Sequence, residues 1–358
     1  MGQPPEEEKP FFETGVVAKS AGGAFAFNAI PGVAATPGGK LLAVWIAYPA
    51  GPNPRLRIVG ALSADGGRGW SPPFFLPIDN PGKEDADPSL VIDGQRILAL
   101  STTLPVPGKI LTTEIWVTTS EDDGKTWSKP FLASTPHKYV EGKVHIGHKL
   151  PDGRLAVGYA WETFCEQGLS PATEGEMDNR AGLMFTRDGG HHWTAGGDIY
   201  ARPPKITPGA VNGMDEPATV VLENGEIFAL LRTATDHLWQ SRSHDRGASW
   251  SAPVPSPLVG HNAPAALWRM RGTNDVVVVW DNSPRHRWPL AVALSRDGCH
   301  TWSEPKIIVD THGQQVSYPA VTQAPDRTLV AVWQQDLPDG KGREVRLARF
   351  NRAWLLSR

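Results

Sequence analysis

The amino-acid sequence predicts an all-β protein, a six-bladed β-propeller with four-stranded antiparallel blades, from three observations. A short apolar run directly after a tight turn occurs six times along the 358 residues. An octamer of the form Ser/Thr-x-Asp-x-Gly-x-x-Trp occurs five times between these runs. Gly (37), Pro (33) and Trp (14) are all frequent, which suits many short strands joined by turns better than helices. Repeats about 55 residues apart, each with room for four strands, are typical of propeller blades.

Each of the six units begins with two apolar stretches that flank a turn. The second stretch and its turn occupy residues 37–45, 93–100, 151–161, 223–231, 272–280 and 325–333. We interpret each unit as a strand, a tight turn and a second strand, followed by a third strand that enters the octamer and a fourth that leaves it.

The octamers are interpreted as structural turns. They begin at Ser63, Ser120, Thr186, Ser243 and Ser295. Their Ser/Thr and Asp side chains can bond the backbone amides of the turn, the Gly allows a positive φ, and the Trp anchors the loop. The fifth copy has Cys299 in place of the Gly, so we expect its turn to be strained or differently shaped. Five copies spread around a ring cannot face one substrate, so the acids of "SEDDGKTW" are scaffold, and calcium binding is a poor alternative.

The sixth unit lacks the octamer and ends in "REVRLARFN". We therefore expect the segment around "FFETGVVAK" to supply its missing strand, which closes the ring and hides its open edges. This makes residues 1–358 one domain, with residues 1–12 as a flexible extension.

Composition excludes several classes of protein. The formal charge of −3, with 20% charged residues, gives no basic footprint for nucleic acid. No apolar run approaches the roughly 20 residues of a membrane span, and the polar start shows no secretory leader. Cys165 and Cys299 are too few for a disulfide framework or a metal cage, so we read them as two unpaired thiols. No metal or cofactor is implied, and the oligomeric state stays open.

A proline stands about eight residues before the first turn of most units, at the place where the innermost strands begin. Proline is tolerated at the first position of a strand, and it holds the preceding residue extended. The preceding residues should stand around the propeller axis, at one mouth of the ring. They are Ile30, Asp87, Glu216, Ala263 and Tyr318, with Val144 and His145 at the matching place in the third unit.

One hairpin can be read in more detail. Glu216 and Arg232 lie symmetrically about the turn at 223–225, so we expect them directly opposite each other, close enough to pair. An alternative reading is a solvated rim salt bridge of little value. Arg285 and Arg287 approach the fifth unit's third strand, and the alternation of "PLAVALS" favours Arg287 as the inward one. Two arginines at one mouth would suit a carboxylate ligand.

The repeated octamer resembles the Asp box of sialidases and related bacterial-neuraminidase-repeat proteins, six-bladed propellers, over roughly residues 20–350. "DEPATVVLENGEIFALLR" is similar to the sialidase segment whose glutamate polarises the nucleophile and whose arginine grips a carboxylate, here Glu216 and Arg232. "SYPAVTQAPDRTLVAVW" resembles the segment of the tyrosine nucleophile, Tyr318. "RWPLAVALSRDG" is similar to the segment of another carboxylate arginine, Arg287. "DADPSLVIDG" resembles one whose aspartate contacts substrate hydroxyls, Asp87.

The chain departs from this family in two places. Ala29 stands where the family has the first arginine of a triad, and the loop 48–58 lacks the usual acid/base aspartate. Arg55 or Arg57 could replace the guanidinium, which makes Arg55 a candidate substrate-binding residue. Glu84, Asp85 or Asp87 could supply the acid, and Asp85 is also a candidate substrate contact.

The resemblance implies a retaining exo-glycosidase that releases a terminal acidic sugar, with sialic acid the first expectation. It also implies an extracellular or periplasmic protein. A polysaccharide lyase acting on uronates is one alternative, with His145 near Tyr318 and Arg232. The other alternative is a propeller that binds acidic glycans without catalysis, which Ala29 and the acid-free loop favour.

Overall fold

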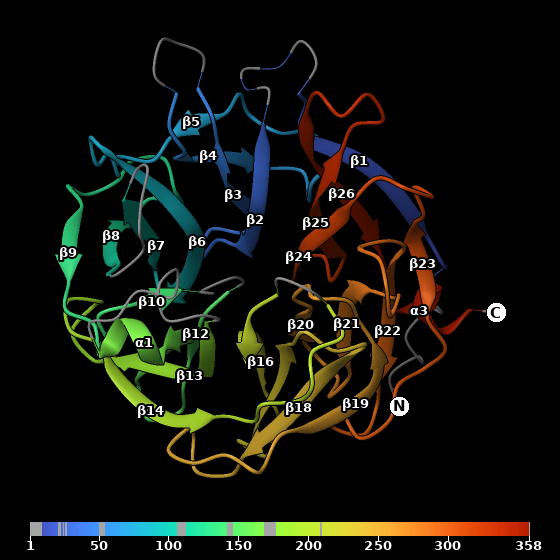
Figure 1. Ribbon diagram of the computed structural model, residues 1–358. Coiled ribbons are helices and arrows are strands. Elements are labelled where there is room, and N and C mark those ends of the chain that lie inside the picture. The colour runs from blue at the N-terminus through green and yellow to red at the C-terminus, as the bar shows by residue number, and fades with distance from the viewer. Residues whose placement is uncertain are drawn as a thin grey trace, which may run out of the picture.

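The computed structural model describes residues 9–20, 23, 25, 27–49, 54–105, 112–141, 146–167, 177–207 and 210–357. Its sheets follow one another around a common axis as six antiparallel blades (Figure 1), which confirms the predicted propeller. Five blades have four strands in their main order, from the innermost to the outermost. The third has two further short strands beside its path.

The first three blades follow the chain in order. Blade one contains β2 (Asn28–Ala35), β3 (Leu41–Ala47), β4 (Arg57–Ser63) and β5 (Phe74–Phe75). Blade two contains β6 (Lys83–Asp93), β7 (Arg96–Pro105), β8 (Glu114–Ser120) and β9 (Phe131–Ala133). Blade three contains β10 (Val140–Glu141), β11 (His148–Lys149), β12 (Leu155–Glu162), β13 (Asp178–Thr186), β14 (Thr194–Ile199) and β15 (Asn212–Gly213), with the helix α1 (Thr163–Glu166).

The remaining blades complete the ring. Blade four contains β16 (Asp215–Val221), β17 (Ile227–Arg232), β18 (His237–Ser243) and β19 (Val254–Val259). Blade five contains β20 (Ala266–Arg269), β21 (Val276–Asp281), β22 (Leu290–Ser295) and β23 (Lys306–Val309). Blade six contains β24 (Val316–Gln323), β25 (Leu329–Asp336), β26 (Arg343–Phe350) and β1 (Phe12–Ala18), and the helix α3 (Arg352–Leu356) follows.

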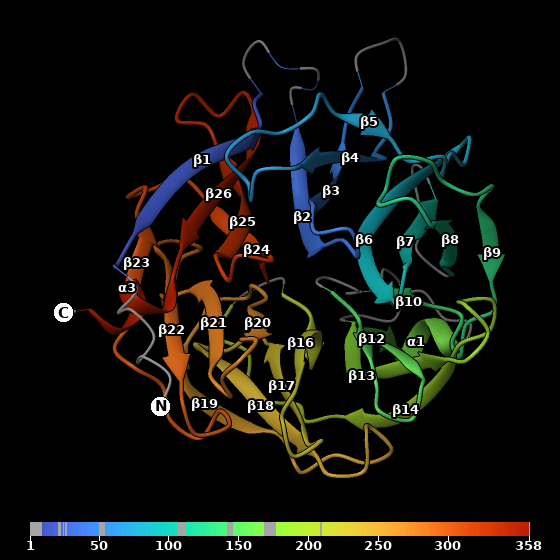
Figure 2. The same ribbon diagram turned by 180° about the vertical axis from the view of Figure 1, so that it is seen from behind.

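The first strand of the chain closes the last blade, as predicted. β1 pairs antiparallel with β26, from Phe12 opposite Phe350 to Ala18 opposite Val345, and the two strands lie side by side in both views (Figures 1 and 2). Asn351 binds the segment just before β1, because its side chain donates to Lys9 O at 2.8 Å and accepts from Phe11 N at 3.2 Å. The prediction of a flexible extension is therefore wrong for residues 9–12, and residues 1–8 lie outside the described part of the chain.

The core lies between neighbouring sheets rather than in one central mass. The second strand of each blade is the most apolar. In β3 all seven residues are buried, and Trp45, Trp280 and Trp333 occupy equivalent places on β3, β21 and β25. Each fully buried apolar side chain stabilises the fold by roughly 1.5–3 kcal/mol before entropy is counted. None of the described helices is long and apolar enough to cross a bilayer.

The five Asp boxes are structural turns between the third and fourth strands. In the first, Asp65 accepts from the Ser63 hydroxyl at 2.8 Å and from Gly69 N at 2.9 Å, and Gly67 N donates to Ser63 at 2.9 Å. The fifth box keeps this pattern, because Cys299 N donates to Ser295 Oγ at 2.8 Å. Cys299 does so with φ of +66°, so its turn is strained but not differently shaped.

The prolines at the strand starts behave differently from the prediction. Four of the residues before them are left-handed instead of extended, with φ of 49° at Ile30, 46° at Asp87, 39° at Glu216 and 54° at Tyr318. Each lies at a register shift in the pairing of the first two strands. The extra residue of such a bulge leaves the ladder, which removes the need for the proline N–H and re-aims a side chain.

In blade five the left-handed residue is Asn262, with φ of 44°, and not Ala263, the residue directly before the proline. Here the proline follows one residue later. Left-handed non-glycine residues are costly and persist where the surrounding structure holds them, often at functional sites.

Candidate active site

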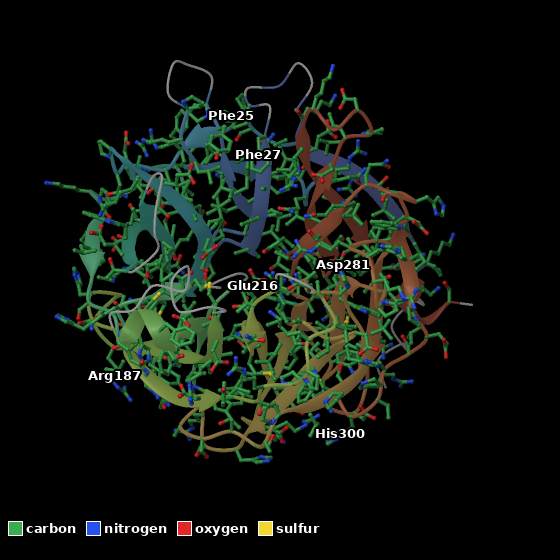
Figure 3. All side chains as sticks on the ribbon, viewed as in Figure 1. Phe25, Phe27, Arg187, Glu216, Asp281 and His300 are labelled. Carbon is green, nitrogen blue, oxygen red and sulfur yellow. The ribbon has the colours of Figure 1, made fainter. Side chains whose placement is uncertain are left out.

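Three predicted side chains from blades four and six meet at one mouth of the ring. The Tyr318 hydroxyl donates to Glu216 Oε1 at 2.9 Å, and Arg232 Nη1 donates to Glu216 Oε2 at 2.7 Å and to Tyr318 Oη at 3.1 Å. Figure 3 labels Glu216 near the middle of the ring. The phenol, the carboxylate and the guanidinium therefore form one closed hydrogen-bonded group.

The expected register of this hairpin is wrong by one residue. Asp215, not Glu216, is the ladder partner of Arg232, because the bulge lies between Asp215 and Ala218. The left-handed backbone at Glu216 nevertheless brings its carboxylate to Arg232, so the predicted contact is observed.

Blade five adds Asn262 and Arg287 to the group. Asn262 Oδ1 accepts from Arg232 Nε at 2.9 Å, and Asn262 O accepts from Arg287. The Arg287 guanidinium lies 5.7 Å from the centre of the Tyr318 ring, whereas Arg285 is exposed to solvent. Arg287 is therefore the inward arginine of the two.

Beside this group lies a pocket of about 370 Å³ between blades one, five and six. Tyr318, Arg287 and Arg343 contribute its ionisable groups on the side of blades five and six, and Gln315 and Gln334 add amides. Apolar walls come from blade one. The apolar side is lined by Phe27, Ala29, Ile30, Ile46 and Leu56, together with the ring of Tyr48.

The phenol of the site is protonated in the resting state. Burial, and then the adjacent Glu216 carboxylate, raise the pKa of Tyr318 well above its usual range. Burial lowers the pKa of Arg232, but Glu216, Tyr318 and Asp215 together outweigh it, so the pKa is raised and the guanidinium stays charged. A phenol in this state becomes nucleophilic only when a base accepts its proton, and Glu216 is in contact to do so.

Behind Glu216 runs a chain of buried and half-buried polar groups. Asn179 Nδ2 donates to Asp215 Oδ1 at 3.0 Å and to Glu141 Oε1 at 2.8 Å, and the Tyr139 hydroxyl donates to Glu141. Burial, with Glu216 next, raises the pKa of Asp215 to about 6. Burial, with Asp215 next, raises the pKa of Glu141 to about 8. A proton on Asp215 or Glu141 relieves the repulsion between these neighbouring carboxyls, so this chain can carry less negative charge behind the site.

Residues 39–332 match the family model described as a BNR repeat-like domain. The chain belongs to this family. No curated protein matches it.

Solved structures similar to this BNR repeat-like protein share its fold at low identity. A protein of unknown function from Dyadobacter fermentans is 19% identical with a TM-score of 0.73, over 95% of this chain and 98% of that one. The Hadza microbial sialidase Hz136 is 16% identical with a TM-score of 0.75, over 94% and 68%. The intramolecular trans-sialidase from Ruminococcus gnavus, solved in complex with oseltamivir carboxylate, is 16% identical with a TM-score of 0.70, over 94% and 96%.

The other predicted site residues of this BNR repeat-like protein have varied positions. Asp87 is half-buried at the bulge of blade two. Asp85 is buried and accepts from Asn80 at 2.8 Å and Arg55 at 3.4 Å. Burial raises the pKa of Asp85, although Asn80 and Arg55 oppose the shift.

Arg55 does not join the group around Tyr318. It forms ion pairs with Asp79 and Asp85, and the described lining of the pocket does not include it. The expectation that it takes the place of the missing triad arginine is therefore not met. His145 lies outside the described residues.

Among the site residues that the sequence did not reveal are Asp215, Asn262 and Arg343. Asp215 and Asn262 each stand one residue before a position that the repeat singled out. A prediction that allowed for a one-residue shift at those positions would have included them. Arg343 lies on the third strand of blade six, where no repeat position points to the mouth. Among the described residues, no group of three His, Cys, Asp or Glu side chains could hold a metal ion.

Proposed function

We propose that the protein is a sialidase-like retaining exo-glycoside hydrolase that releases a terminal acidic sugar, sialic acid first, from glycan ends. The observation that carries this proposal is the 2.9 Å contact between the Tyr318 hydroxyl and the Glu216 carboxylate, with Arg287 lying over the phenol ring. The similar folds of a microbial sialidase and of an intramolecular trans-sialidase add support at the level of the fold.

In the first step, Glu216 accepts the proton of Tyr318 while the phenolate oxygen attacks the anomeric carbon. The bond from that carbon to the leaving oxygen breaks as the new carbon–oxygen bond forms, and the leaving oxygen departs with the electron pair and takes a proton from solvent. In the second step, water attacks the same carbon and releases a proton to solvent, the bond to Tyr318 breaks, and Glu216 returns its proton to the phenolate. Two inversions at one carbon give net retention.

A phenol is a suitable nucleophile for this class of substrate. The anomeric carbon of a sialic acid carries a carboxylate, and an ionised Asp or Glu nucleophile would be repelled by it; tyrosine nucleophiles are a known exception among glycosidases for this reason. The neutral phenol approaches without that repulsion, and its charge develops only as Glu216 takes the proton. Arg232, at 3.1 Å from the phenol oxygen, stabilises the developing charge.

The guanidinium groups at the mouth are the reason to expect an acidic sugar rather than a neutral one as the substrate. Arginine matches a carboxylate through two parallel hydrogen bonds, and partial burial strengthens such charge-assisted bonds. A neutral sugar would leave these groups without a partner in a pocket from which water is partly excluded.

The test is a screen of sialosides and uronides with the wild-type chain and Tyr318→Phe side by side. We expect hydrolysis of at least one aryl sialoside, with product that does not absorb in the ultraviolet, and loss of turnover in Tyr318→Phe. A product with a new ultraviolet-absorbing double bond would indicate a lyase instead. Binding of an acidic sugar without any product, unchanged in Tyr318→Phe, would indicate a non-catalytic propeller.

A further inference from the structure

Hydrogen bonds to neighbouring site residues largely occupy the guanidinium of Arg232. Its Nη1 donates to both Glu216 and Tyr318, and its Nε donates to Asn262. The described lining of the 370 Å³ pocket includes Arg287 and Arg343 but not Arg232. The guanidinium groups that a ligand in this pocket meets therefore come from blades five and six.

Arg343 is held at the seam between the last blade and the first. Its backbone forms a parallel bridge with Phe27, and its carbonyl accepts from Asn28 Nδ2 at 3.1 Å. The guanidinium lies 4.8 Å from the centre of the Phe27 ring, a cation–π contact that fixes its plane. Phe27 is labelled on the blade-one side of the ring in Figure 3, and it lines the same pocket two residues before Ala29.

The hydrogen bonds of the Arg343 side chain leave room for a ligand. Its Nε donates to Asp336, and within the described part of the chain its two terminal nitrogen atoms form no hydrogen bond. The side chain is 20% exposed and that of Asp336 is 32% exposed, so solvent weakens their mutual attraction. A planar guanidinium with both terminal nitrogen atoms available can bind both oxygens of a carboxylate.

Arg287 adds a second positive charge to the pocket. Its described hydrogen-bond partner is the neutral carbonyl of Asn262. Arg287 and Arg343 line one cavity together with the Tyr318 phenol, and Ala29 provides space between blade one and the phenol because its side chain is a single methyl group. Such a cavity favours an anion placed against the nucleophile.

We propose that Arg343 is a specificity-determining residue, which together with Arg287 clasps the carboxylate of the acidic sugar. This inference rests on the proposed function, since it names the groups that select the substrate of the same site. Arg232 then does not bind the substrate carboxylate: it holds Glu216 and Tyr318 in contact and stabilises the charge that develops on the phenol oxygen.

The test is calorimetric titration of the wild-type chain, Arg343→Gln and Asp336→Asn with free N-acetylneuraminic acid and with its methyl ester. We expect Arg343→Gln to weaken binding of the acid by about 10- to 100-fold, as for loss of a charge-assisted pair, and to leave binding of the ester nearly unchanged. Asp336→Asn removes the competing carboxylate, so it should retain or strengthen binding of the acid.

Asp336→Asn is also the control for folding. If the Arg343–Asp336 pair were only structural, both variants would lower the melting temperature and weaken the acid and the ester alike. Equal losses for the two ligands, or acid binding by Arg343→Gln within twofold of wild type, would overturn the proposal. Acid binding that depends on Arg343 in a chain that hydrolyses no sialoside would support Arg343 and overturn the proposed hydrolysis. No acid binding by the wild-type chain would overturn both.

Discussion

Glu226 and Arg242 form an ion pair in blade four whose side chains are 10% and 17% exposed, close to the 10% and 13% of Glu216 and Arg232. The two pairs also have the same sixteen-residue separation. The Glu216–Arg232 pair lies in the proposed site. The Glu226–Arg242 pair lies beside the fourth Asp box, because Arg242 directly precedes its first residue, Ser243. The chain thus contains an internal control for any substitution at the site.

We expect Glu216→Gln to lower kcat on an aryl sialoside by about 10²–10⁴-fold, because it removes the group that accepts the Tyr318 proton. Glu216→Gln and Glu226→Gln should each lower the free energy of unfolding by about 1–3 kcal/mol, because each breaks a mostly buried ion pair. Glu226→Gln should leave kcat nearly unchanged. Steady-state kinetics and thermal melts of both variants check this. Equal loss of activity in the two would assign Glu216 a structural role only.

The dependence of turnover on the leaving group should be steep. The loop 48–58 contains no acidic residue to protonate the leaving oxygen. Substrates with aryl leaving groups, which depart as stable phenolates, should react about 10²–10⁴-fold faster than alkyl or glycosyl sialosides. Comparison of kcat/KM over a series of leaving groups measures this. A flat series would mean that another residue of the site donates the proton.

Asp281 should make the fold less stable as pH rises. Burial raises the pKa of Asp281 well above its usual range although Arg287 opposes the shift, and neither carboxyl oxygen has a hydrogen-bond partner among the described residues. The folded state keeps a proton that the unfolded state releases above about pH 4, so stability should fall with rising pH by up to about 1.4 kcal/mol per unit.

Asp281→Asn removes this titration and should raise the melting temperature at pH 7 and flatten its pH dependence above pH 4. Asp275→Asn, at the residue directly before β21, breaks the 2.6 Å pair with Arg352 and should lower the melting temperature. Melting curves from pH 4 to pH 8 measure both. A lower melting temperature for Asp281→Asn at pH 7 would show that the ionised carboxylate stabilises Arg287.

Both thiols should be unreactive in the folded protein. Cys165 and Cys299 are buried, and burial raises the pKa of each to about 12. Thiolate is the reactive form, so a disulfide reagent at pH 8 should modify neither residue in native protein and both in denaturant. Rapid native modification of one thiol would mean that its blade opens locally.

Arg246→Gly should stabilise the fourth Asp box. Arg246 is exposed and has φ of 60°, at the position where the first, third and fifth boxes have Gly with φ of 71–75°. The strain relieved in the left-handed backbone should exceed the entropy that Gly adds to the unfolded chain. The free energy of unfolding should therefore rise by about 0.5–1 kcal/mol. Arg68→Gly, at an exposed box position without positive φ, should give no gain. Denaturant titrations of the two variants distinguish the effects.

The repeats made most of the architecture predictable. Blade number, strand order, the role of the Asp boxes and closure by the N-terminal segment all follow from spacing, because each repeat buries one face against its neighbour. Tyr318, Glu216 and Arg287 could be placed at the mouth for the same reason: equivalent positions of a ring share one axis.

What the sequence did not reveal depends on single-residue shifts of the backbone. A bulge inserts one residue, so Asp215 takes the ladder place expected for Glu216; in blade five Asn262, one residue before Ala263, has the left-handed backbone. The preference of a residue before proline for extended backbone was overridden by packing at four blades. Arg343 was missed because its contact with Phe27 joins strands that are far apart in sequence and belong to different repeats.

The seam between β26 and the first blade has a consequence for synthesis of the chain. Arg343 follows Phe27 by most of the propeller along the chain, and Tyr318 also lies in the sixth blade, which is synthesised after the other five. A ribosome that has produced the first five blades therefore carries an incomplete ligand pocket and an unclosed ring. The pocket should be complete only after β26 has left the exit tunnel, which ties the appearance of any ligand binding there to synthesis of the sixth blade.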